Sequence, residues 1–572
     1  MKKILFKITT VLLVMAVVFT SSASALTATF SYSSAVEKKL FSTAKLKDYV
    51  KPSTPAFDKS KSSGYITTTK TRISYLKKMV KNNDYMSLYF REDLADTPVV
   101  FFTGEDMSAV TDWQSACQAF AASDKVNVLY QAQLHGNEPA AGEGALYFLQ
   151  RIADDEEYAA KLAEHLNICV VPCANPDAAE INSRESRDGL NVNRDNLIVD
   201  SEYTVWLHNL YAALMPEVVL DSHECMSNLQ VSPKATSDFF TDVYFAGTSS
   251  LNIDERINEW SSVLRDSGMK GCKNAGLRVS IYDSEITAVN NTVSRTYYGL
   301  YGSVSVLIES MGINMGKNHF GRRVYSHYKA VDSILKAVIK NKDEISQDVA
   351  EARRELSERG KDYDADNRFA LEQKVSGNEY TTVTRDVFSA KTGSKIKTVK
   401  YKVRWHDEIV RSRSLPTAYV ISKKAKNAAL AAEKLQSSGI EYFELEAGSK
   451  IKASQFSGNG EKAKIIKGKD LTFSKGAYII PMDQAGAKVI AACLEPDVTE
   501  TLDYEGTFVQ AGLLNAKYIY RYTKSNPREG LKEMTVGYEA PAAEDENTVD
   551  PAESAETIDA PVILVEPSVL TQ

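Results

Sequence analysis

The stretch VNVLYQAQLHGNEPAAGEGALYFLQRI, residues 126–152, holds a strand, a polar loop and a helix in close succession. Val126 to Ala132 is a short apolar run of the kind that forms a buried strand. Gly142 to Ile152 has the apolar spacing of a helix. The loop between them is polar, so the strand should deliver polar side chains to one edge of a sheet.

The same order recurs along the chain. Apolar runs at Leu166 to Pro172, Val218 to Leu220 and Ser303 to Ile308 are each followed by polar residues, and Asp84 to Phe90 and Pro98 to Phe102 are further strand candidates. Short apolar strands that alternate with helices predict an α/β fold with a mixed, largely parallel sheet covered by helices. In open α/β sheets ligands bind beyond the carboxyl ends of the strands, so the polar residues mark a candidate site.

The chain of 572 residues is too long for one core. A charged stretch and a second strand–helix pattern divide it further. The predicted divisions are a signal peptide at 1–25, a lead-in, linker or pro-segment at 26–63, a main domain at 64–340, a charged helical linker at 341–375, a smaller accessory α/β domain at 376–539 and an acidic disordered tail at 540–572.

The N-terminus has the pattern of an export signal. Lys2, Lys3 and Lys7 precede the apolar run Val11 to Phe19, and Ala23 to Ala25 fits a cleavage site. No later run reaches the roughly 18 apolar residues of a membrane span, so we expect a secreted or cell-envelope protein with no stable span after cleavage. The net charge of −7 argues against a nucleic-acid partner.

Two short motifs supply metal-binding side chains. LHGNE at Leu134 to Glu138 offers His135 and Glu138, and LDSHE at Leu220 to Glu224 offers His223. Two imidazoles and one carboxylate form a three-ligand Zn²⁺ site that leaves a position open for water, as in catalytic zinc sites. The sequence therefore predicts one zinc ion per chain.

Four motifs occur in a fixed order: LHGNEPAAGEGAL, NPDAAEINSRESRDGLNVNRDN, LDSHE and YYGLYGSVSVLIESMG. With them the chain from about Gly64 to Lys340 resembles the zinc carboxypeptidase family of carboxypeptidase A, which implies that family's fold for a peptidase domain at 64–340. The resemblance implies that His135, Glu138 and His223 bind zinc. The segment GAYIIPMDQAGAKVIAACLEPDVTETLD is similar to an accessory C-terminal region of some large bacterial members.

The resemblance also implies catalytic roles. Zinc would polarise the scissile carbonyl and lower the pKa of a bound water. Glu309 would act as the general base and then pass the proton to the leaving amine. Glu224 is the rival base, although its neighbour His223 faces the metal and the strand should aim Glu224 elsewhere. Arg184 matches the arginine that stabilises the oxyanion, with Arg187 as a nearby competitor.

Asn193 and Arg194 match the pair that binds the C-terminal carboxylate of the substrate, for which the planar guanidinium fork is suited. This pair favours an exopeptidase whose partner is a peptide with a free C-terminal carboxylate. Asn191 is a departure, because the family usually has an Asp at this position. The change puts the geometry around Arg194 or around a ligand in doubt.

The family brings a mobile tyrosine over that carboxylate. Tyr282 in SIYDSE is the best match, with Tyr297 and Tyr298 as alternatives. The floor of the side-chain pocket is expected between Tyr282 and Tyr298. Arg295 lies in this stretch and suggests an acidic side chain, although an arginine just before YYG can also be structural.

The function that the sequence favours is an exported zinc-dependent carboxypeptidase, a hydrolase that removes C-terminal residues by means of metal-activated water. One alternative is a zinc amidase or endopeptidase that acts on cell-wall stem peptides or N-acyl amino acids with the same zinc chemistry. Another is a non-catalytic binding protein on the same fold. The presence of all four residues His135, Glu138, His223 and Glu309 argues against that last alternative.

Overall fold

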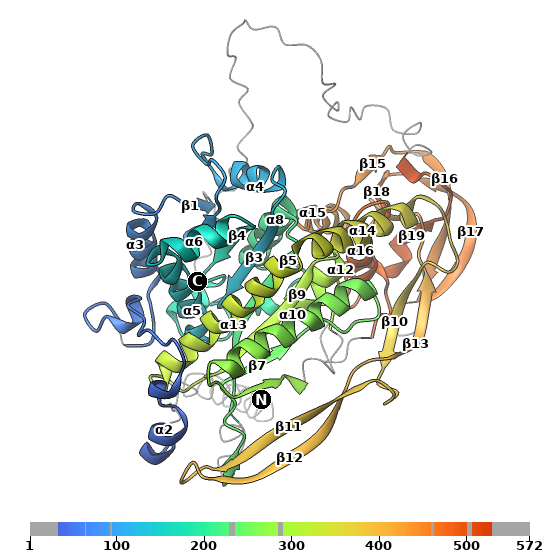
Figure 1. Ribbon diagram of the computed structural model, residues 1–572. Coiled ribbons are helices and arrows are strands. Elements are labelled where there is room, and N and C mark those ends of the chain that lie inside the picture. The colour runs from blue at the N-terminus through green and yellow to red at the C-terminus, as the bar shows by residue number, and fades with distance from the viewer. Residues whose placement is uncertain are drawn as a thin grey trace, which may run out of the picture.

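The computed structural model describes residues 32–62, 64–91, 94–227, 235–283, 290–458, 463–499 and 506–528. Its main element is an eight-stranded sheet in the order β1-β2-β4-β3-β5-β9-β7-β8 (Figure 1). The pairs β3/β4, β3/β5, β5/β9 and β7/β8 are parallel, and the remaining three pairs are antiparallel. The predicted mixed, largely parallel sheet is confirmed. Its strands are β1 Met86–Arg91, β2 Leu94–Phe102, β3 Val126–Ala132, β4 Leu166–Val171, β5 Val218–Cys225, β7 Val243–Ala246, β8 Val279–Ile281 and β9 Val304–Met311.

Helices cover this sheet. Helix α5 packs against α13, β3 and β5, and α10 packs against α13, β7 and β9. Helix α5 follows the β3 loop directly and begins with Pro139, whose missing N–H is tolerated in a first helical turn. The helices of this part of the chain are α3 Thr69–Val80, α4 Trp113–Ala121, α5 Pro139–Ala153, α6 Glu156–Ala163, α7 Pro176–Glu180, α8 Glu202–Leu214, α10 Glu255–Asn274, α12 Ser294–Leu300 and α13 Phe320–Lys340.

Two central strands are longer than the sequence predicts. The apolar runs suggest that β5 and β9 end before His223 and Glu309, but both strands continue past these residues, and every residue in them is buried. Successive residues of a strand face opposite sides of the sheet. A strand can therefore present polar side chains on one face while its other residues face the core. His223 and Glu309 are therefore held by the sheet and do not lie in loops.

The predicted helical linker at 341–375 is only partly helical. Helix α14, Lys342–Lys361, buries apolar residues at helical spacing, among them Ile345 and Val349. Strand β10, Arg368–Lys374, then pairs antiparallel with β13, Glu408–Ser414. The prediction relied on charge, and charge alone does not distinguish an exposed helix from an exposed strand.

The accessory part of the chain contains a long hairpin and a second sheet. Strands β11, Tyr380–Ser389, and β12, Lys395–Arg404, form the hairpin, which reaches back along the first sheet (Figure 1). The second sheet has six strands in the order β15-β18-β14-β19-β16-β17, with antiparallel pairing throughout its described part. Its elements are β14 Ala418–Ser422, α15 Ala428–Ser437, β15 Phe443–Leu445, β16 Ser449–Ser457, β17 Lys464–Phe473, β18 Ala477–Pro481, α16 Ala487–Leu494, the short helix η4 Ala516–Tyr518 and β19 Ile519–Tyr522.

One hydrophobic cluster runs through both sheets. It includes Trp206 and Tyr301 from the first part of the chain and Ile421 and Ile480 from the accessory part. A buried polar contact joins them as well, since Nδ1 of His208 lies 3.0 Å from the hydroxyl of Ser438. The accessory part is thus packed firmly against the first sheet.

The described part of the predicted lead-in, 32–62, lies against the first sheet's helices. It contains α2 Ser34–Leu40 and the short helices η1 Thr43–Lys45 and η2 Pro55–Phe57. Glu143 on α5 accepts a hydrogen bond from the backbone of Ala56 at 2.8 Å. The predicted signal peptide and acidic tail lie outside the described residues. Among the described helices, none combines the length and the apolar character needed to cross a membrane.

Candidate active site

His135, Glu138 and His223 meet in one buried cluster. His135 and Glu138 lie in the turn between β3 and α5, and His223 lies on β5. Nδ1 of His135 is 2.7 Å from Oε1 of Glu138, and Nδ1 of His223 is 2.9 Å from its Oε2. The turn depends on Gly136, where a Cβ atom would lie 1.9 Å from the backbone of Ala178. The structure therefore brings together the three predicted ligands, with one ligand atom of each within 4.8 Å of the others.

The cluster fits a zinc ion. The Nδ1 atoms of His135 and His223 lie 3.2 Å apart and cannot both carry a proton pointing at the other, whereas a shared cation satisfies both nitrogens and the carboxylate. Burial lowers the pKa of His135 to about 4, which keeps its imidazole in the neutral form that binds metal. Burial raises the pKa of Glu138, but the two imidazoles outweigh it and hold that pKa well below its usual range. Glu138 is therefore ionised, as a carboxylate that binds a metal must be.

Outer partners orient both imidazoles. Nε2 of His135 lies 3.1 Å from Oδ1 of Asn191. Nε2 of His223 lies 3.0 Å from Oδ1 of Asp221, a buried residue on the same face of β5. An oxygen beside Nε2 favours the tautomer that carries its proton there and leaves Nδ1 available to a metal. Asn191, the departure seen in the sequence, thus contacts a ligand. Asp221 was missed, although its spacing of two residues from His223 on a strand was a usable signal.

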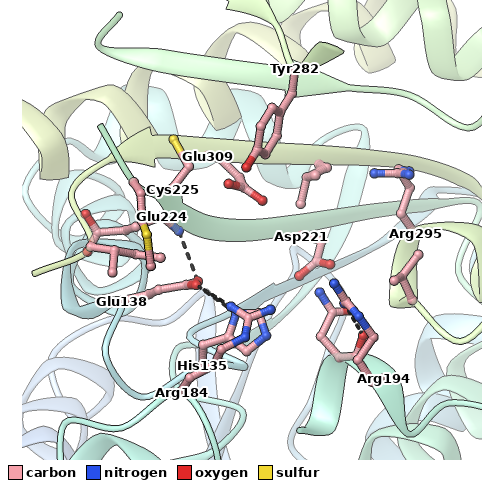
Figure 2. Close-up of a pocket in the computed structure, with 15 residues that line it drawn as sticks. His135, Glu138, Arg184, Arg194, Asp221, Glu224, Cys225, Tyr282, Arg295 and Glu309 are labelled. Carbon is pink, nitrogen blue, oxygen red and sulfur yellow. Dashed lines mark hydrogen bonds and ion pairs between the residues drawn. The ribbon is translucent and has the colours of Figure 1, made fainter. Parts of the chain in front are cut away.

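Glu309 faces the metal cluster from the neighbouring strand. It pairs in parallel register with His223, and the residue is 9% exposed at the edge of a cavity of about 390 Å³. Figure 2 shows Glu309 and Asp221 between the wall that carries His135 and the wall that carries Tyr282. The cavity is lined by His135, Glu138, Arg184, Asn193, Arg194, Asp221, Glu224, Cys225, Met226, Tyr282, Val293, Arg295, Leu307, Glu309 and Ile313.

Glu224, the rival base, is engaged elsewhere. Its carboxylate accepts two hydrogen bonds from Arg323 on α13 at 2.8 Å each and one from the backbone of Ala140 at 2.7 Å. Burial raises the pKa of Glu224, and the guanidinium of Arg323 only partly opposes it. The contribution of Glu224 to the metal cluster is its backbone N–H, which donates to Glu138 at 3.0 Å.

The two candidate oxyanion arginines separate clearly. Nη1 of Arg184 lies 3.2 Å from Nδ1 of His135 and 3.6 Å from the Glu138 carboxylate, beside the metal cluster. Arg187 instead pairs with Asp177 and is largely exposed. Of the two, Arg184 is the arginine that lines the cavity.

The three predicted substrate-binding residues also line the cavity. Asn193 and Arg194 belong to the short helix η3, Val192–Arg194, which Ser294 fixes by donating its N–H to Oδ1 of Asn193 at 2.9 Å. Tyr282 enters from the opposite wall, at the end of β8 (Figure 2). The alternatives are engaged in the core. Tyr297 stacks on His208, and the hydroxyl of Tyr298 donates to Gln131 at 3.0 Å.

This geometry agrees with the comparisons to known proteins. Residues 104–303 match the zinc carboxypeptidase family. The chain contains a zinc carboxypeptidase domain. The match covers the metal cluster, Asn193 and Arg194 and ends before Glu309. Because the family is zinc-dependent and the donor set fits, zinc is the cofactor of this domain.

Two proteins with similar sequences are named carboxypeptidases, and solved structures are similar to part of the chain. Carboxypeptidase 2 of Trichophyton tonsurans is 25% identical over 463 residues, which are 75% of this chain and 82% of that protein. Carboxypeptidase 2 of Trichophyton equinum is 26% identical over 408 residues, 66% of this chain and 73% of that protein. The solved structure of bovine thrombin-activatable fibrinolysis inhibitor shares 12% identity over 48% of this chain and 98% of its own, with a TM-score of 0.37.

Proposed function

We propose that this chain is an exported carboxypeptidase that uses one zinc ion to remove C-terminal residues from peptides. The observation that carries the proposal is the position of Glu309, in register with the metal ligand His223 and facing the same cavity as Asn193 and Arg194. A base, a metal cluster and a carboxylate-binding pair then surround one space large enough for a terminal residue.

The chemistry is hydrolysis of the last peptide bond. Zinc held by His135, Glu138 and His223 would supply Lewis-acid polarisation of the carbonyl and a lowered pKa for water. Glu309 accepts a proton as water attacks the carbonyl carbon, and it returns a proton to the nitrogen that leaves. Arg184 donates hydrogen bonds to the oxygen that becomes negative during the attack.

The carboxylate-binding pair sets the exopeptidase character. Arg194 offers a planar guanidinium to the terminal carboxylate. Its Nη1 donates a hydrogen bond to the carbonyl of Asn193 at 2.7 Å, which helps to hold the side chain in place. Tyr282 is proposed to close over the same carboxylate. A substrate with no free carboxylate does not form the charge-assisted hydrogen bonds that Arg194 offers, which disfavours its binding.

Export is proposed from the sequence of the first 25 residues. The basic start, the apolar run and the Ala-Ser-Ala cleavage pattern support it. These residues precede the described part of the chain, so the proposal rests on composition. Edman sequencing of protein recovered from the culture medium of its host tests it, and Leu26 is the expected first residue.

A mixed-peptide library tests the activity. The wild-type protein with zinc should shorten peptides by one residue at a time from the C-terminus, as read by mass spectrometry. Glu309→Gln, which keeps the shape of the side chain but cannot accept a proton, is the matched control and should leave the library intact. Cleavage at internal bonds, or release of acyl groups in place of terminal residues, would replace this proposal with the endopeptidase or amidase alternative.

A further inference from the structure

The β11–β12 hairpin of the accessory part reaches the wall of the candidate active site. Strand β11 pairs with β6, Ser237–Asp238, through Phe388 and Ser389. Figure 1 shows the hairpin running from the accessory sheet along the edge of the first sheet near β7. This edge ends in β8, a strand of three residues that leads directly to Tyr282.

Arg385 on β11 is hydrogen-bonded to the segment that carries Tyr282. Its guanidinium donates to the carbonyl of Ile281 at 2.6 Å and also to the hydroxyl of Ser280 and the carboxylate of Asp283. The Arg385 side chain is 9% exposed. Its partners therefore lie on both sides of Tyr282 in the sequence.

Aromatic rings fix the guanidinium in turn. The Arg385 guanidinium carbon lies 5.2 Å from the ring centroids of Phe239 and Tyr244 and 5.5 Å from that of Tyr401. Cation–π contacts of this kind favour a charged group that is held away from water. Tyr244 also packs on Tyr282, with ring centroids 5.4 Å apart. Arg385 and Tyr282 thus contact the same aromatic cluster.

Tyr282 follows the last strand at this edge of the sheet. Strand β8 is an edge strand that ends at Ile281, and the backbone N–H of Tyr282 donates to the carbonyl of Phe245 at 2.8 Å. The hairpin residues Val383 and Val403 share one hydrophobic cluster with Ile281 and with Leu307, which lines the cavity. The hairpin thus covers this edge of the sheet, which is one of the ways in which proteins protect an edge strand.

We infer that Arg385 is a positioning residue, which holds the segment 280–283 so that Tyr282 points into the substrate pocket. The accessory hairpin is then part of the active site, although it lies outside the matched family region. Its kinetic consequence rests on the proposed function, because Tyr282 is assigned there to the substrate carboxylate. The grip on the segment does not depend on that function.

Hydrogen exchange tests the grip directly. Arg385→Met keeps the aliphatic packing and removes all N–H donors. Its amides at 279–283 should exchange about ten- to a hundredfold faster than in the wild type, the factor for losing a charge-assisted hydrogen bond. Arg404→Met, an exposed change on the other strand of the hairpin, should leave this exchange unchanged. Asp283→Asn keeps the hairpin intact and should give a smaller increase. Unchanged exchange in Arg385→Met would overturn the inference.

Kinetics test the positioning role. With free-acid peptides, Arg385→Met should raise KM about tenfold, with zinc content unchanged. In a Tyr282→Ala background it should add little, because residues that act through one another are not additive. Full additivity would mean that Arg385 does not act through Tyr282 and would overturn the inference. If the wild type trims no peptide at all, the proposed function fails, and the exchange measurement alone then decides whether the grip exists.

Discussion

His223 and Glu309 are register partners on the adjacent parallel strands β5 and β9. Both side chains therefore face the same side of the sheet, while Glu224 and Ser310, the next residues, face the other. Glu224 and Ser310 are in fact hydrogen-bonded to each other at 3.0 Å. The pleat of two strands thus separates the carboxylate proposed as the catalytic base, Glu309, from the carboxylate paired with Arg323, Glu224, and the two roles can be tested separately.

Glu309→Gln should retain zinc and substrate binding but lose about two to four orders of magnitude in turnover, the range for general acid–base catalysis. Glu224→Gln should act on stability, because it leaves Arg323 buried without a counter-charge, at a cost of about 3–5 kcal/mol. Steady-state kinetics and thermal unfolding of both variants make the comparison. A folded Glu224→Gln protein without turnover, beside an active Glu309→Gln protein, would reverse the two roles.

The metal cluster predicts one zinc ion per chain. His135→Ala and His223→Ala each remove one of three protein ligands and should reduce bound zinc and activity together. His165 is a partly exposed histidine outside the metal cluster, so His165→Ala should keep both the bound zinc and the activity. Elemental analysis after dialysis measures the zinc. Full zinc in either ligand variant would show that the ion binds elsewhere.

Asp221 should tune the metal site. Its carboxylate lies 3.0 Å from Nε2 of His223, and such outer partners typically change metal affinity by about 10–100-fold. Asp221→Asn should weaken zinc binding by a factor in that range, as measured by competition with a chromophoric chelator. Ser222→Ala, on the opposite face of β5, is the control. An unchanged dissociation constant for zinc in Asp221→Asn would show that Asp221 does not tune the metal site and that its role is confined to substrate contacts.

Asp242 should make the stability of the folded protein depend on pH in the acid range. Burial raises its pKa, but Arg278 and Arg322 outweigh it, so the pKa lies below the ordinary value. A depressed pKa means that the stabilisation is present above the unfolded value of about 3.9 and is lost as the pH falls through the folded value. Asp242→Asn should therefore unfold at a lower temperature at pH 7, and its difference from the wild type should shrink towards pH 3. The exposed Asp366→Asn serves as the control. An equal difference at both pH values would show that the charge of Asp242 plays no part.

Much of the first sheet could be predicted from the sequence. The run Val126 to Ala132 is strand β3 with the predicted bounds, because a buried parallel strand is apolar on both faces. The ends of β5 and β9 could not be predicted in this way. Both strands continue through polar residues at the candidate site. A buried strand is normally recognised by a run of apolar residues, and these polar residues interrupt that run. These polar residues include the candidate site residues His223 and Glu309.

The site could be predicted where a motif is local. His135 and Glu138 lie three residues apart in one short motif, and the motif LDSHE supplied His223 as the third candidate ligand. The choice between Arg184 and Arg187 needed the structure, since only the fold places Asp177 beside Arg187. Arg385 could not be found from the sequence, because it lies about a hundred residues from the segment it contacts and shares no motif with it.

The central claim is that the pocket recognises a free C-terminal carboxylate. The direct measurement compares the cleavage rate of one peptide as the free acid and as the C-terminal amide, with wild-type protein and with Arg194→Ala. The wild type should cut the free acid faster than the amide by about ten- to a hundredfold, the value of a lost charge-assisted bond. Arg194→Ala should remove most of this difference by slowing the free acid alone, and the exposed Arg187→Ala should preserve it. Equal wild-type rates for acid and amide would contradict the account.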